Sequence, residues 1–371
     1  LKIVAPGCKI RLVMNIIFKN RQSKIFSEMS QRKIDALLVS DPLSIFYFTG
    51  IHVNPMERLF ALYFEKGETV LFANTLFCIK NAECSVVLYS DGINTADFLT
   101  AHILKQGTMG IDGMWPARFL IPLMKKNPAV NFVCGSECVD SLRGCKDAQE
   151  ISLMKTAAAI ADDCLQKAFN FIHDGVTEKE VASYIDSLFA KAGAEPSFET
   201  IVSFGKNAAA PHHVPDGTKP SRGDVVLIDL GCKKNGYCSD MTRTSFFLTA
   251  PKEVAQIHDI VRRANEYAKS IIKPGVALKD IDSAARNLIE EAGYGKNFTH
   301  RLGHFCGMAD HEAGDVSQSS TLTAREGMIF SIEPGIYIEG KAGIRIEDLV
   351  LVTKDGCESL NKLDSHWHIL G

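Results

Sequence analysis

The sequence predicts an α+β protein in which a small α/β domain precedes a larger, internally duplicated domain. Three observations support this prediction. The 371 residues are enough for two hydrophobic cores. Short apolar runs alternate with helical stretches up to about Gly144. Beyond that point, one order of helices and strands occurs twice, about one hundred residues apart. We therefore place the two domains at residues 14–144 and 145–371.

The composition restricts the classes of partner. The 41 basic and 44 acidic residues give a formal net charge of −3 and form no long basic run, so we expect neither nucleic acid nor an anionic membrane as a partner. No apolar run reaches the roughly 18 residues of a membrane span. The eleven cysteines show no Cys-x-x-Cys spacing. Several lie in apolar runs, which is typical of reduced thiols in a cytoplasmic protein.

The chain begins with an unusual segment. Leu1–Val13 precedes Met14, where the sequence becomes more ordinary. Leu12–Phe18 is too short and too interrupted for the apolar core of a signal peptide. We interpret Leu1–Val13 as a cloning or start-site artefact, or as a poorly ordered tail.

The first domain is predicted to contain short strands and a few helices. A polar amphipathic helix is expected over 20–33, with further helices near 95–105 and 116–126. A hairpin is expected at Glu65-Lys66-Gly67-Glu68, which separates two apolar runs. The expected strands are 36–39, 59–64, 69–72, 86–89, 109–111 and 132–134. The polar segment Asn54–Arg58 is the one candidate functional feature in this domain, and a surface loop is the alternative.

Helices open each half of the second domain. Glu150–Phe171 is rich in alanine, and Thr177-Glu178-Lys179-Glu180 has the capping-box pattern that begins a helix. Matches one hundred residues apart join Gly175 to Gly275, Lys179 to Lys279, Ser183 to Ser283, Leu188 to Leu288, Gly193 to Gly293 and Phe198 to Phe298. These matches predict two similar halves. Because they are thinly spread, chance similarity is the alternative.

The first half contains a hairpin that carries two aspartates. Val225–Gly231 and Tyr237–Thr244 are strand-like runs separated by Asn235-Gly236, which supplies the two positive φ angles of a tight turn. With this turn, Asp229 lies opposite Thr242, and Asp240 is its diagonal neighbour on the same face. Two such carboxylates repel each other unless a cation lies between them. An edge strand with solvated acids is the alternative.

The duplication predicts a matching hairpin in the second half. Gly223–Gly231 aligns with Gly327–Gly335, so that Asp229 corresponds to Glu333. The chain then turns and returns, which places Glu333 opposite Glu347. Four carboxylates in one cavity require counter-charge, and two divalent cations would supply it.

Histidines just ahead of the second hairpin can complete a ligand set. His300, His304 and His311 lie within twelve residues, and glycines near His304 allow the backbone to approach a site closely. An ordinary structural role is the alternative for each histidine. Ligation by Cys238 or Cys306, which lie near these segments, is a further alternative.

Together these motifs resemble the metallopeptidases of the methionine aminopeptidase and prolidase family. The resemblance covers most of residues 145–365. It lies in Asp229, in Asp240 eleven residues later, in Gly-His-x-x-Gly at 303–307, in Glu333-Pro334-Gly335 and in Arg345-Ile346-Glu347-Asp348. It implies a catalytic domain of the pita-bread fold and two divalent metal ions. The ligands that it implies are Asp229, Asp240, His304, Glu333 and Glu347. Oxygen ligands with one imidazole suit Mn²⁺, with Co²⁺ and Zn²⁺ as alternatives.

The proline-specific branch of the family is the most similar. Pro211-His212-His213, His311-Glu312 and the α/β N-terminal domain resemble that branch, in particular Xaa-Pro dipeptidases. The resemblance implies a homodimer that hydrolyses short proline-containing peptides with a water shared by two metals, whose pKa falls to roughly 7. An Xaa-Pro aminopeptidase that acts on longer peptides is the alternative. A metal-free binding protein is a second alternative.

The resemblance also implies roles for individual side chains. Glu333 takes a proton from the water, while His212 and His311 hold the carbonyl oxygen and assist proton transfer to the leaving nitrogen. Arg345 pairs with a ligand carboxylate or the substrate carboxylate, and a structural salt bridge is the alternative. One departure from the family is Phe305, which replaces the middle glycine of Gly-His-Gly-x-Gly. We expect its ring to narrow the site or to line a substrate pocket.

Overall fold

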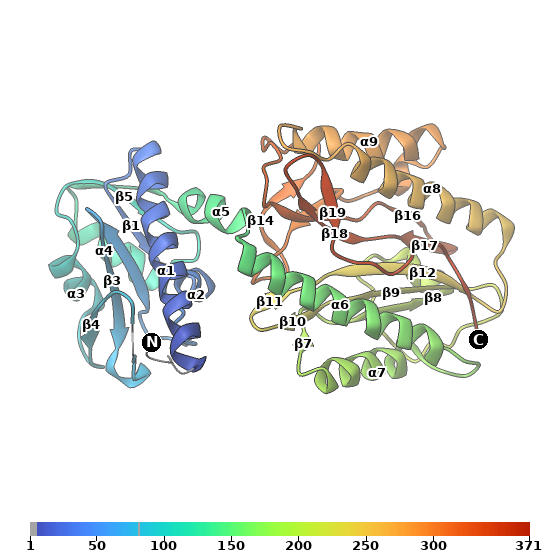
Figure 1. Ribbon diagram of the computed structural model, residues 1–371, viewed down its shortest axis with the longest axis horizontal. Helices are drawn as coiled ribbons and strands as arrows, with labels where there is room; N and C mark the ends of the chain where they lie inside the picture. Colours follow the sequence, from blue (N-terminus) through green and yellow to red (C-terminus); the bar gives the residue numbers. More distant parts are fainter. Residues whose placement is uncertain (1–5, 81) are drawn as a thin grey trace. The chain divides into compact units, whose positions relative to one another are not determined.

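The structure is a computed structural model that describes residues 6–80 and 82–371, with side chains described from Ile16 onward. The chain divides into two compact units, Leu1–Arg143 and Gly144–Gly371 (Figure 1). Among the described residues, no helix combines the length and the apolar character that crossing a membrane requires.

The first unit contains a six-stranded mixed sheet with the strand order β4-β3-β2-β1-β5-β6. Strand β1 is antiparallel to β2 and parallel to β5. The strands are β1 Ala36–Val39, β2 Ala61–Glu65, β3 Glu68–Asn74, β4 Ser85–Tyr89, β5 Gly107–Ile111 and β6 Val130–Cys134. The helices are α1 Pro6–Gln31, α2 Pro42–Thr49, α3 Thr95–His102, α4 Ala117–Lys126, α5 Ser136–Gly144 and the short 3-10 helix η1 Thr75–Phe77.

The elements predicted for this unit are present, with small shifts at their ends. The predicted hairpin turns at Lys66-Gly67, whose φ angles of 49° and 83° are those of a tight two-residue turn. Helix α2 was not predicted because it is almost entirely apolar and lacks the polar–apolar period of a surface helix. Its start is fixed by Asp41, whose carboxylate accepts hydrogen bonds from the N–H groups of Leu43 and Ser44.

The N-terminal segment is part of a longer helix than the sequence predicts. Helix α1 begins at Pro6, a residue that suits the first position of a helix. Residues 6–13 therefore form the start of α1 rather than a separate tail. Residues 1–5, which belong to the segment interpreted as an artefact or tail, lie outside the described residues.

The second unit places two pairs of helices around its strands. In Figure 1, α6 and α7 lie on one side of the strands, and α8 and α9 lie on the other. These helices are α6 Ala148–Phe171, α7 Glu178–Lys191, α8 Lys252–Ser270 and α9 Leu278–Glu291. The strands of the first half are β7 Glu195–Pro196, β8 Ile201–Phe204, β9 Val225–Leu230, β10 Cys232–Lys234, β11 Tyr237–Cys238 and β12 Met241–Phe247, and η2 covers Gly205–Ala209. The second half begins its strand region with the 3-10 helix η3 Gly295–Asn297. Its strands are β13 Gly303–Phe305, β14 Glu312–Val316, β15 Ile329–Ile332, β16 Gly335–Ile338, β17 Ala342–Arg345, β18 Asp348–Val352, β19 Cys357–Ser359 and β20 Ile369–Leu370.

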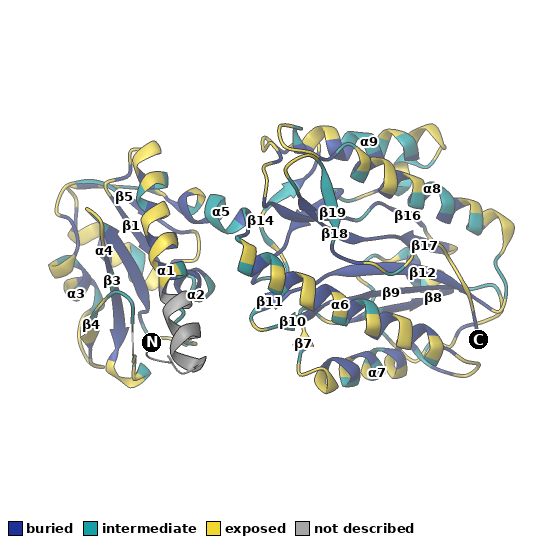
Figure 2. Cartoon of the chain, in the orientation of Figure 1, coloured by how far each residue is buried: buried dark blue, intermediate teal, exposed yellow. Residues whose placement is uncertain are grey.

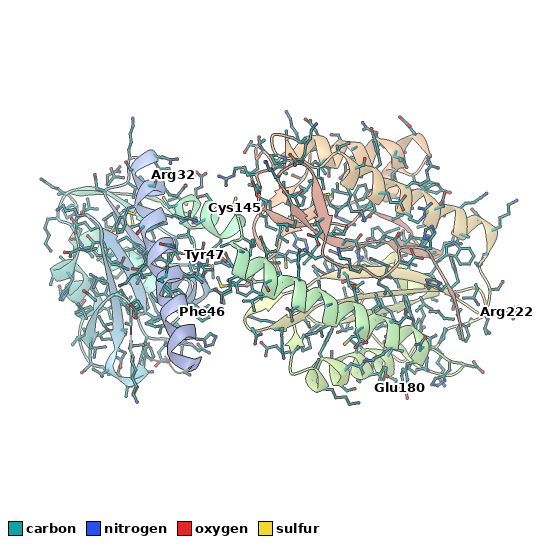
Figure 3. The ribbon with its side chains drawn as sticks, in the orientation of Figure 1. Arg32, Phe46, Tyr47, Cys145, Glu180 and Arg222 are labelled. Atoms are coloured by element: carbon teal, nitrogen blue, oxygen red, sulfur yellow. The ribbon has the colours of Figure 1, made fainter. Side chains whose placement is uncertain are left out.

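The internal duplication is visible in equivalent elements. Helices α7 and α9 each span 14 residues and begin one hundred residues apart. Each is preceded and followed by a glycine with positive φ, namely Gly175 and Gly193 in the first half and Gly275 and Gly293 in the second. The start of α7 is the predicted capping box, in which Glu180 accepts a hydrogen bond from the N–H of Thr177 at 2.8 Å (Figure 3).

The register predicted for the first hairpin is confirmed. Strands β9 and β12 place Asp229 opposite Thr242. The turn residues Asn235 and Gly236 have φ angles of 52° and 84°, as the sequence predicts. The hairpin is interrupted at Gly231, so β9–β12 and β10–β11 belong to two different sheets.

The register predicted for the second hairpin is also found. Ile332 lies opposite Asp348, and Gly335 lies opposite Arg345. The two pairings share one register, which places Glu333 across from Glu347 in the gap between them.

Two apolar clusters enclose these strands. One lies between the strands of the second half and helices α8 and α9, and the other between the strands of the first half and helices α6 and α7. Figure 2 shows the central strands buried and the outer faces of the helices exposed. The hairpins are therefore held from both sides by packed helices, which gives any side chain between them a rigid support.

Candidate metal centre

One cavity of about 540 Å³ in the second unit collects every site residue predicted from the sequence. Its lining includes Asp229, Asp240, His304, Glu333, Glu347, His212, His311 and Arg345. The additional lining residues include Ile201, Pro211, Val214, Pro215, His300, Arg301 and Asp310. The cavity therefore combines a dense group of acids with cationic and apolar walls.

The first hairpin supplies two buried aspartates. Every residue of β9 is buried, so Asp229 emerges from an apolar strand with its side chain only 11 % exposed. Asp240 follows the break at Gly231, where an added Cβ would overlap the backbone oxygen of Ser239. Only glycine permits this close approach of the two strands, and Asp240, which follows it, is a buried residue of the cavity lining.

The second hairpin supplies two glutamates at the point where its strands separate. The N–H of Glu333 donates to the carbonyl of Leu302 at 2.8 Å, and the N–H of Glu347 donates to the carbonyl of Thr242 at 3.1 Å. The Thr242 hydroxyl donates to Glu347 Oε2 at 2.8 Å. Both glutamates are thus attached to neighbouring elements rather than to each other.

His304, on strand β13, directs its imidazole at one carboxylate of each hairpin. Its Nε2 is 3.4 Å from Asp240 Oδ2 and 3.5 Å from Glu333 Oε1. Gly303 allows β13 to lie this close to β15, because an added Cβ there would overlap the carbonyl oxygen of Ser331. Donor atoms of Asp240, His304 and Glu347 all lie within 4.8 Å of one another.

The electrostatics of the centre favour a bound cation. Burial, followed by the neighbouring carboxylates, raises the pKa of Asp240 and of Glu347 well above the ordinary range. Burial raises the pKa of Glu333 to about 8 and lowers that of His304 to about 3. Asp229 Oδ1 is buried without a hydrogen-bond partner in the described part of the chain. A neutral imidazole, crowded carboxylates and an orphaned oxygen are a donor set that fits divalent metal ions.

Arg345 contacts the predicted ligand Asp229 directly. Its guanidinium lies 2.5 Å from Asp229 Oδ2 and donates to the Tyr337 hydroxyl at 2.9 Å and to Thr242 Oγ1 at 3.1 Å. The side chain is 4 % exposed. The structure thus pairs Arg345 with Asp229, the carboxylate that the sequence predicts as a metal ligand, in a buried salt bridge.

The two remaining predicted residues flank the acids. His212 is exposed in the wall of the cavity. The ring of His311 stacks on that of His304, with ring centroids 3.7 Å apart. His311 Nδ1 is 3.1 Å from an Arg301 nitrogen, and burial lowers the pKa of His311. His213, next to His212, instead contacts Glu178 Oε2 at 2.7 Å.

The sequence assigned no role to Asp310 and Tyr337, and it named His300 only among the histidines that could complete a ligand set. Asp310 lines the cavity beside Asp240, and burial raises its pKa to about 7. His300 Nε2 lies 3.0 Å from the Tyr337 hydroxyl that also binds Arg345. Asp310 was detectable from its position next to His311. The contact between His300 and Tyr337 joins segments 37 residues apart and has no local signal.

Phe305 does not shape the cavity, contrary to the expectation from the sequence. Its side chain points away from His304 into the core and is 2 % exposed. The ring packs against Phe330 and occupies space left by Gly144 and Gly314, where an added Cβ would approach it. Alternating side chains of a strand face opposite sides, so the residue after a ligand on β13 faces the core.

Cys238 and Cys306 are buried thiols outside the cavity. Burial raises the pKa of Cys238 to about 12 and that of Cys306 well above its ordinary value, and neither residue lines the cavity. Metal ligation requires a thiolate, which burial disfavours at both positions. The structure therefore gives no support to ligation by either cysteine.

The polar segment Asn54–Arg58 of the first unit is an exposed turn. Arg58 within it pairs with Asp91 at 2.8 Å. A surface loop is therefore the interpretation that the structure supports for this segment.

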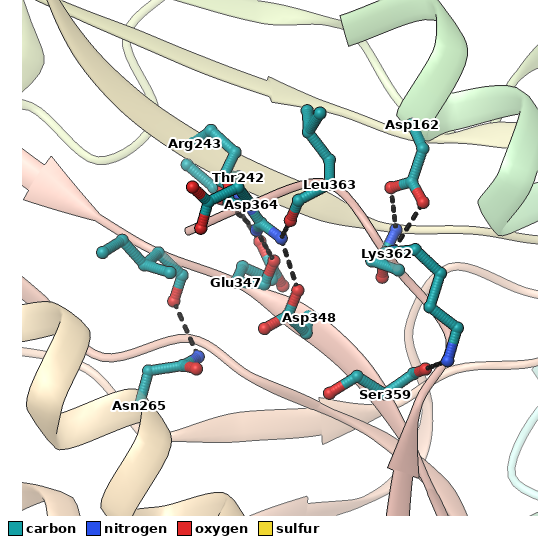
Figure 4. Close-up of polar contacts among 12 residues, drawn as sticks. Asp162, Thr242, Arg243, Asn265, Glu347, Asp348, Ser359, Lys362, Leu363 and Asp364 are labelled. Atoms are coloured by element: carbon teal, nitrogen blue, oxygen red, sulfur yellow. Dashed lines mark hydrogen bonds and ion pairs between the residues drawn. The ribbon is translucent and has the colours of Figure 1, made fainter. Parts of the chain in front are cut away.

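A network of polar contacts holds the backbone around Glu347 (Figure 4). Arg243 donates to the carbonyl of Glu347 at 2.6 Å and pairs with Asp348 at 2.7 Å. Lys269 pairs with the second oxygen of Asp348, also at 2.7 Å. In Figure 4, Asn265 approaches the same strands from helix α8. These contacts fix the backbone on both sides of Glu347.

Comparisons with known proteins find similar sequences and similar structures. The model described as metallopeptidase family M24 matches residues 152–354, and that of the creatinase/prolidase N-terminal domain matches residues 21–145. An uncharacterized peptidase of Staphylococcus saprophyticus is 38% identical over 350 residues, which are 91% of this chain and 97% of that protein. The prolidase of Pyrococcus horikoshii has a similar structure, with a TM-score of 0.84, 33% identity and coverage of 93% of this chain and 99% of that one. The X-Pro aminopeptidase of Thermotoga maritima gives a TM-score of 0.79, 31% identity and coverage of 92% and 99%.

Proposed function

We propose that this chain, which belongs to metallopeptidase family M24, hydrolyses Xaa-Pro dipeptides. The observation that carries this proposal is the convergence of Asp229, Asp240, His304, Glu333 and Glu347 in one cavity. The prolidase similarity supports the proline specificity.

These five residues are the proposed ligands of two divalent metal ions. When bound, the metals supply Lewis-acid polarisation and lower the pKa of a water molecule. We propose Mn²⁺ because the donor set is oxygen-rich with one imidazole, and Co²⁺ and Zn²⁺ are the alternatives. Arg345, which also lines the cavity, holds Asp229 in place through an ion pair, and the Thr242 hydroxyl holds Glu347 through a hydrogen bond.

The remaining polar residues are proposed to handle protons and the substrate. Glu333 is proposed to accept the proton of the attacking water, because its carboxylate lines the cavity among the other proposed ligands. His212 and His311 stand in the cavity wall beside the acids. From there they are placed to hold the substrate carbonyl and to pass a proton to the proline nitrogen.

The wall of the cavity suits a short peptide that ends in proline. Arg301 is 37% exposed in the wall and is placed to receive the carboxylate of a dipeptide. Arg345 is not available for this role because it is buried and bound to Asp229. Pro211, Val214 and Pro215 provide apolar surface for a proline ring. The nitrogen of an Xaa-Pro bond carries no N–H, so it needs no hydrogen-bond acceptor in the wall. An apolar wall without such an acceptor therefore favours an Xaa-Pro bond over other peptide bonds.

The test is release of free proline from Ala-Pro in the presence of Mn²⁺. Asp240→Asn is expected to reduce the rate about a thousandfold, because metal ions contribute several kcal/mol of charge stabilisation. Asp163→Asn is the matched control, since Asp163 is 60% exposed and pairs with Lys167 on the surface. Equal activity of Asp240→Asn and the wild type would exclude this function.

An Xaa-Pro aminopeptidase is the second candidate, supported by the similarity to the Thermotoga maritima enzyme. Rates on Ala-Pro and on Ala-Pro-Gly-Gly discriminate between the two. A dipeptidase that uses Arg301 is expected to prefer Ala-Pro, and Arg301→Gln is expected to reduce that preference. A preference for the tetrapeptide in the wild type would favour the aminopeptidase.

A metal-free binding protein is the third candidate. Elemental analysis of the purified protein, before and after incubation with Mn²⁺, decides this point, because a binding protein of this kind takes up no metal.

We further propose a cytoplasmic homodimer. Light scattering of the purified chain tests the dimer, and a molar mass near 40.7 kDa, that of one chain, would contradict it.

A further inference from the structure

Asn265 is a buried polar residue that connects the two strands of the second hairpin. Its Nδ2 donates to the carbonyl of Ile332 at 2.8 Å and to that of Ile346 at 3.2 Å. The side chain reaches these strands from α8, as Figure 4 shows. One amide group therefore binds both strands at the point where their pairing is interrupted.

The two carbonyls belong to the residues immediately before Glu333 and Glu347. At this point one backbone hydrogen bond, from Ile346 N to the Pro334 carbonyl at 3.4 Å, still joins the strands, and the N–H groups of both glutamates donate to other elements. Without Asn265 the two carbonyl oxygens would lose these hydrogen bonds inside the protein, which is costly. Because both oxygens bind the same nitrogen, the distance between the two strands is fixed there.

The environment of Asn265 argues against a simple packing role. The residue is fully buried in a helix whose inner face is otherwise largely apolar, including Val261, Ala264 and Ala268. Its Oδ1 has no hydrogen-bond partner in the described part of the chain. An amide that uses its donors and leaves its acceptor unpaired costs stability that an apolar side chain would avoid.

We infer that Asn265 is a positioning residue that sets the spacing of Glu333 and Glu347, and thereby the affinity of the centre for divalent cations. This inference rests on the proposed function, since it assumes that both glutamates are ligands. Residues that orient metal ligands without touching the metal typically change metal affinity by about 10–100-fold.

Calorimetric titration with Mn²⁺ alone tests the inference. Asn265→Asp keeps the shape but replaces the two N–H donors with an oxygen that repels the carbonyls, and we expect Mn²⁺ to bind about 10–100-fold more weakly. Asn127→Asp is the matched control. Asn127 is a buried asparagine of the first unit that donates to Leu123 and Thr100, and its substitution is expected to leave Mn²⁺ binding unchanged.

The outcomes are distinguishable. If the wild type binds no Mn²⁺, the proposed function fails. If the wild type binds Mn²⁺ and Asn265→Asp binds it equally well, the inference about Asn265 fails alone. Should Asn265→Asp be unfolded without metal, Asn265→Leu replaces it, because leucine fills the site without a charge. Loss of folding in both variants would assign Asn265 to the core and overturn the inference.

Discussion

The two hairpins of the second unit carry equivalent carboxylates but are held by different contacts. In the first, the strands stay together at the break, where Cys232 N donates to Ser239 Oγ at 3.0 Å and Ser239 N donates to the Cys232 carbonyl at 2.8 Å. In the second, one backbone hydrogen bond, from Ile346 N to the Pro334 carbonyl at 3.4 Å, joins the strands, and Asn265 also joins them from a helix. The duplicated halves thus share positions of the acids and differ in the groups that fix those positions.

The segments that precede the two hairpins are also held by different contacts. In the first half, the buried carboxylate of Glu178 accepts hydrogen bonds from Phe204 N, Asn207 Nδ2 and Asp216 N and contacts His213. It therefore ties together the segment that carries His212. The second half uses an ion pair, in which Asp282 binds Arg286 at 2.8 Å and accepts from Leu302 N. Arg286 in turn donates to the carbonyls of Phe298 and His300.

The sharpest contrast within the first hairpin is between Asp229 and Asp240, because only Asp229 has a cationic partner. In metal-free protein, Asp229→Asn is expected to reduce the free energy of unfolding by about 3–5 kcal/mol, since it leaves the buried Arg345 without its ion pair. Asp240→Asn removes a carboxylate surrounded by other carboxylates, so its effect is expected to stay within about 1 kcal/mol. Urea denaturation of both variants in a metal chelator measures the difference. Equal destabilisation would show that Arg345 does not depend on Asp229.

Glu178 on α7 allows a test of whether the segment that carries His212 and the metal ligands have separate roles. Glu178→Gln replaces one acceptor oxygen with a donor and leaves its loop donors unpaired, so that His212 loses its support. We expect kcat for Ala-Pro to fall about tenfold to a hundredfold, the range of a general acid–base contribution, with Mn²⁺ affinity unchanged. Hydrogen exchange of residues 205–218 should rise in parallel.

Asp112→Asn provides the control for Glu178→Gln, since Asp112 is a buried carboxylate of the first unit that accepts from the N–H groups of Ser40 and Asp41. It is expected to leave kcat unchanged. A loss of Mn²⁺ affinity in Glu178→Gln would contradict the separation of tasks, because none of the five proposed ligands lies on the anchored segment.

The acids of both hairpins make metal stabilisation dependent on pH. Burial raises the pKa of Glu333 from 4.5 to about 8, so in metal-free protein its contribution to stability is present below about pH 4.5 and is lost as the pH rises towards 8. Metal binding requires the deprotonated carboxylate. The increase in thermal midpoint caused by a fixed Mn²⁺ concentration should therefore be several degrees larger at pH 8.5 than at pH 5.5. An increase independent of pH would contradict the raised pKa.

The smallest effect is expected at Phe305, which follows a proposed ligand but faces the core. Phe305→Leu is expected to lower the free energy of unfolding by about 1–2 kcal/mol through imperfect packing and to leave KM for Ala-Pro unchanged. Thermal denaturation and steady-state kinetics measure the two quantities. A change in KM without loss of stability would restore the idea that this ring contributes to the substrate pocket.

The sequence predicts the hairpins better than their surroundings. Asn235-Gly236 defines the register of the first hairpin, and from it the pairing of Asp229 with Thr242 follows by counting. The duplication extends this logic to Glu333 and Glu347. Such predictions succeed because turn chemistry and strand periodicity act over a few residues.

Contacts between the halves have no such local signal. Arg345 and Asp229 are 116 residues apart, and nothing near either residue identifies its partner. The direction of Phe305 depends on which face of β13 meets the core, and the role of Asn265 depends on the packing of α8. These features are decided by tertiary packing, so the sequence left several partners open for Arg345 and placed Phe305 on the wrong face.

The ion pair between Arg345 and Asp229 also limits how far the two halves can exist apart. Each half contributes one member of a buried charged pair, and a buried charge without its partner is strongly unfavourable. A fragment that ends in the connection before α8 would carry Asp229 without its guanidinium, and the complementary fragment would carry the guanidinium alone. We therefore expect the domain to unfold as one cooperative unit, and we expect its separated halves to recover their shape when they reassociate with each other.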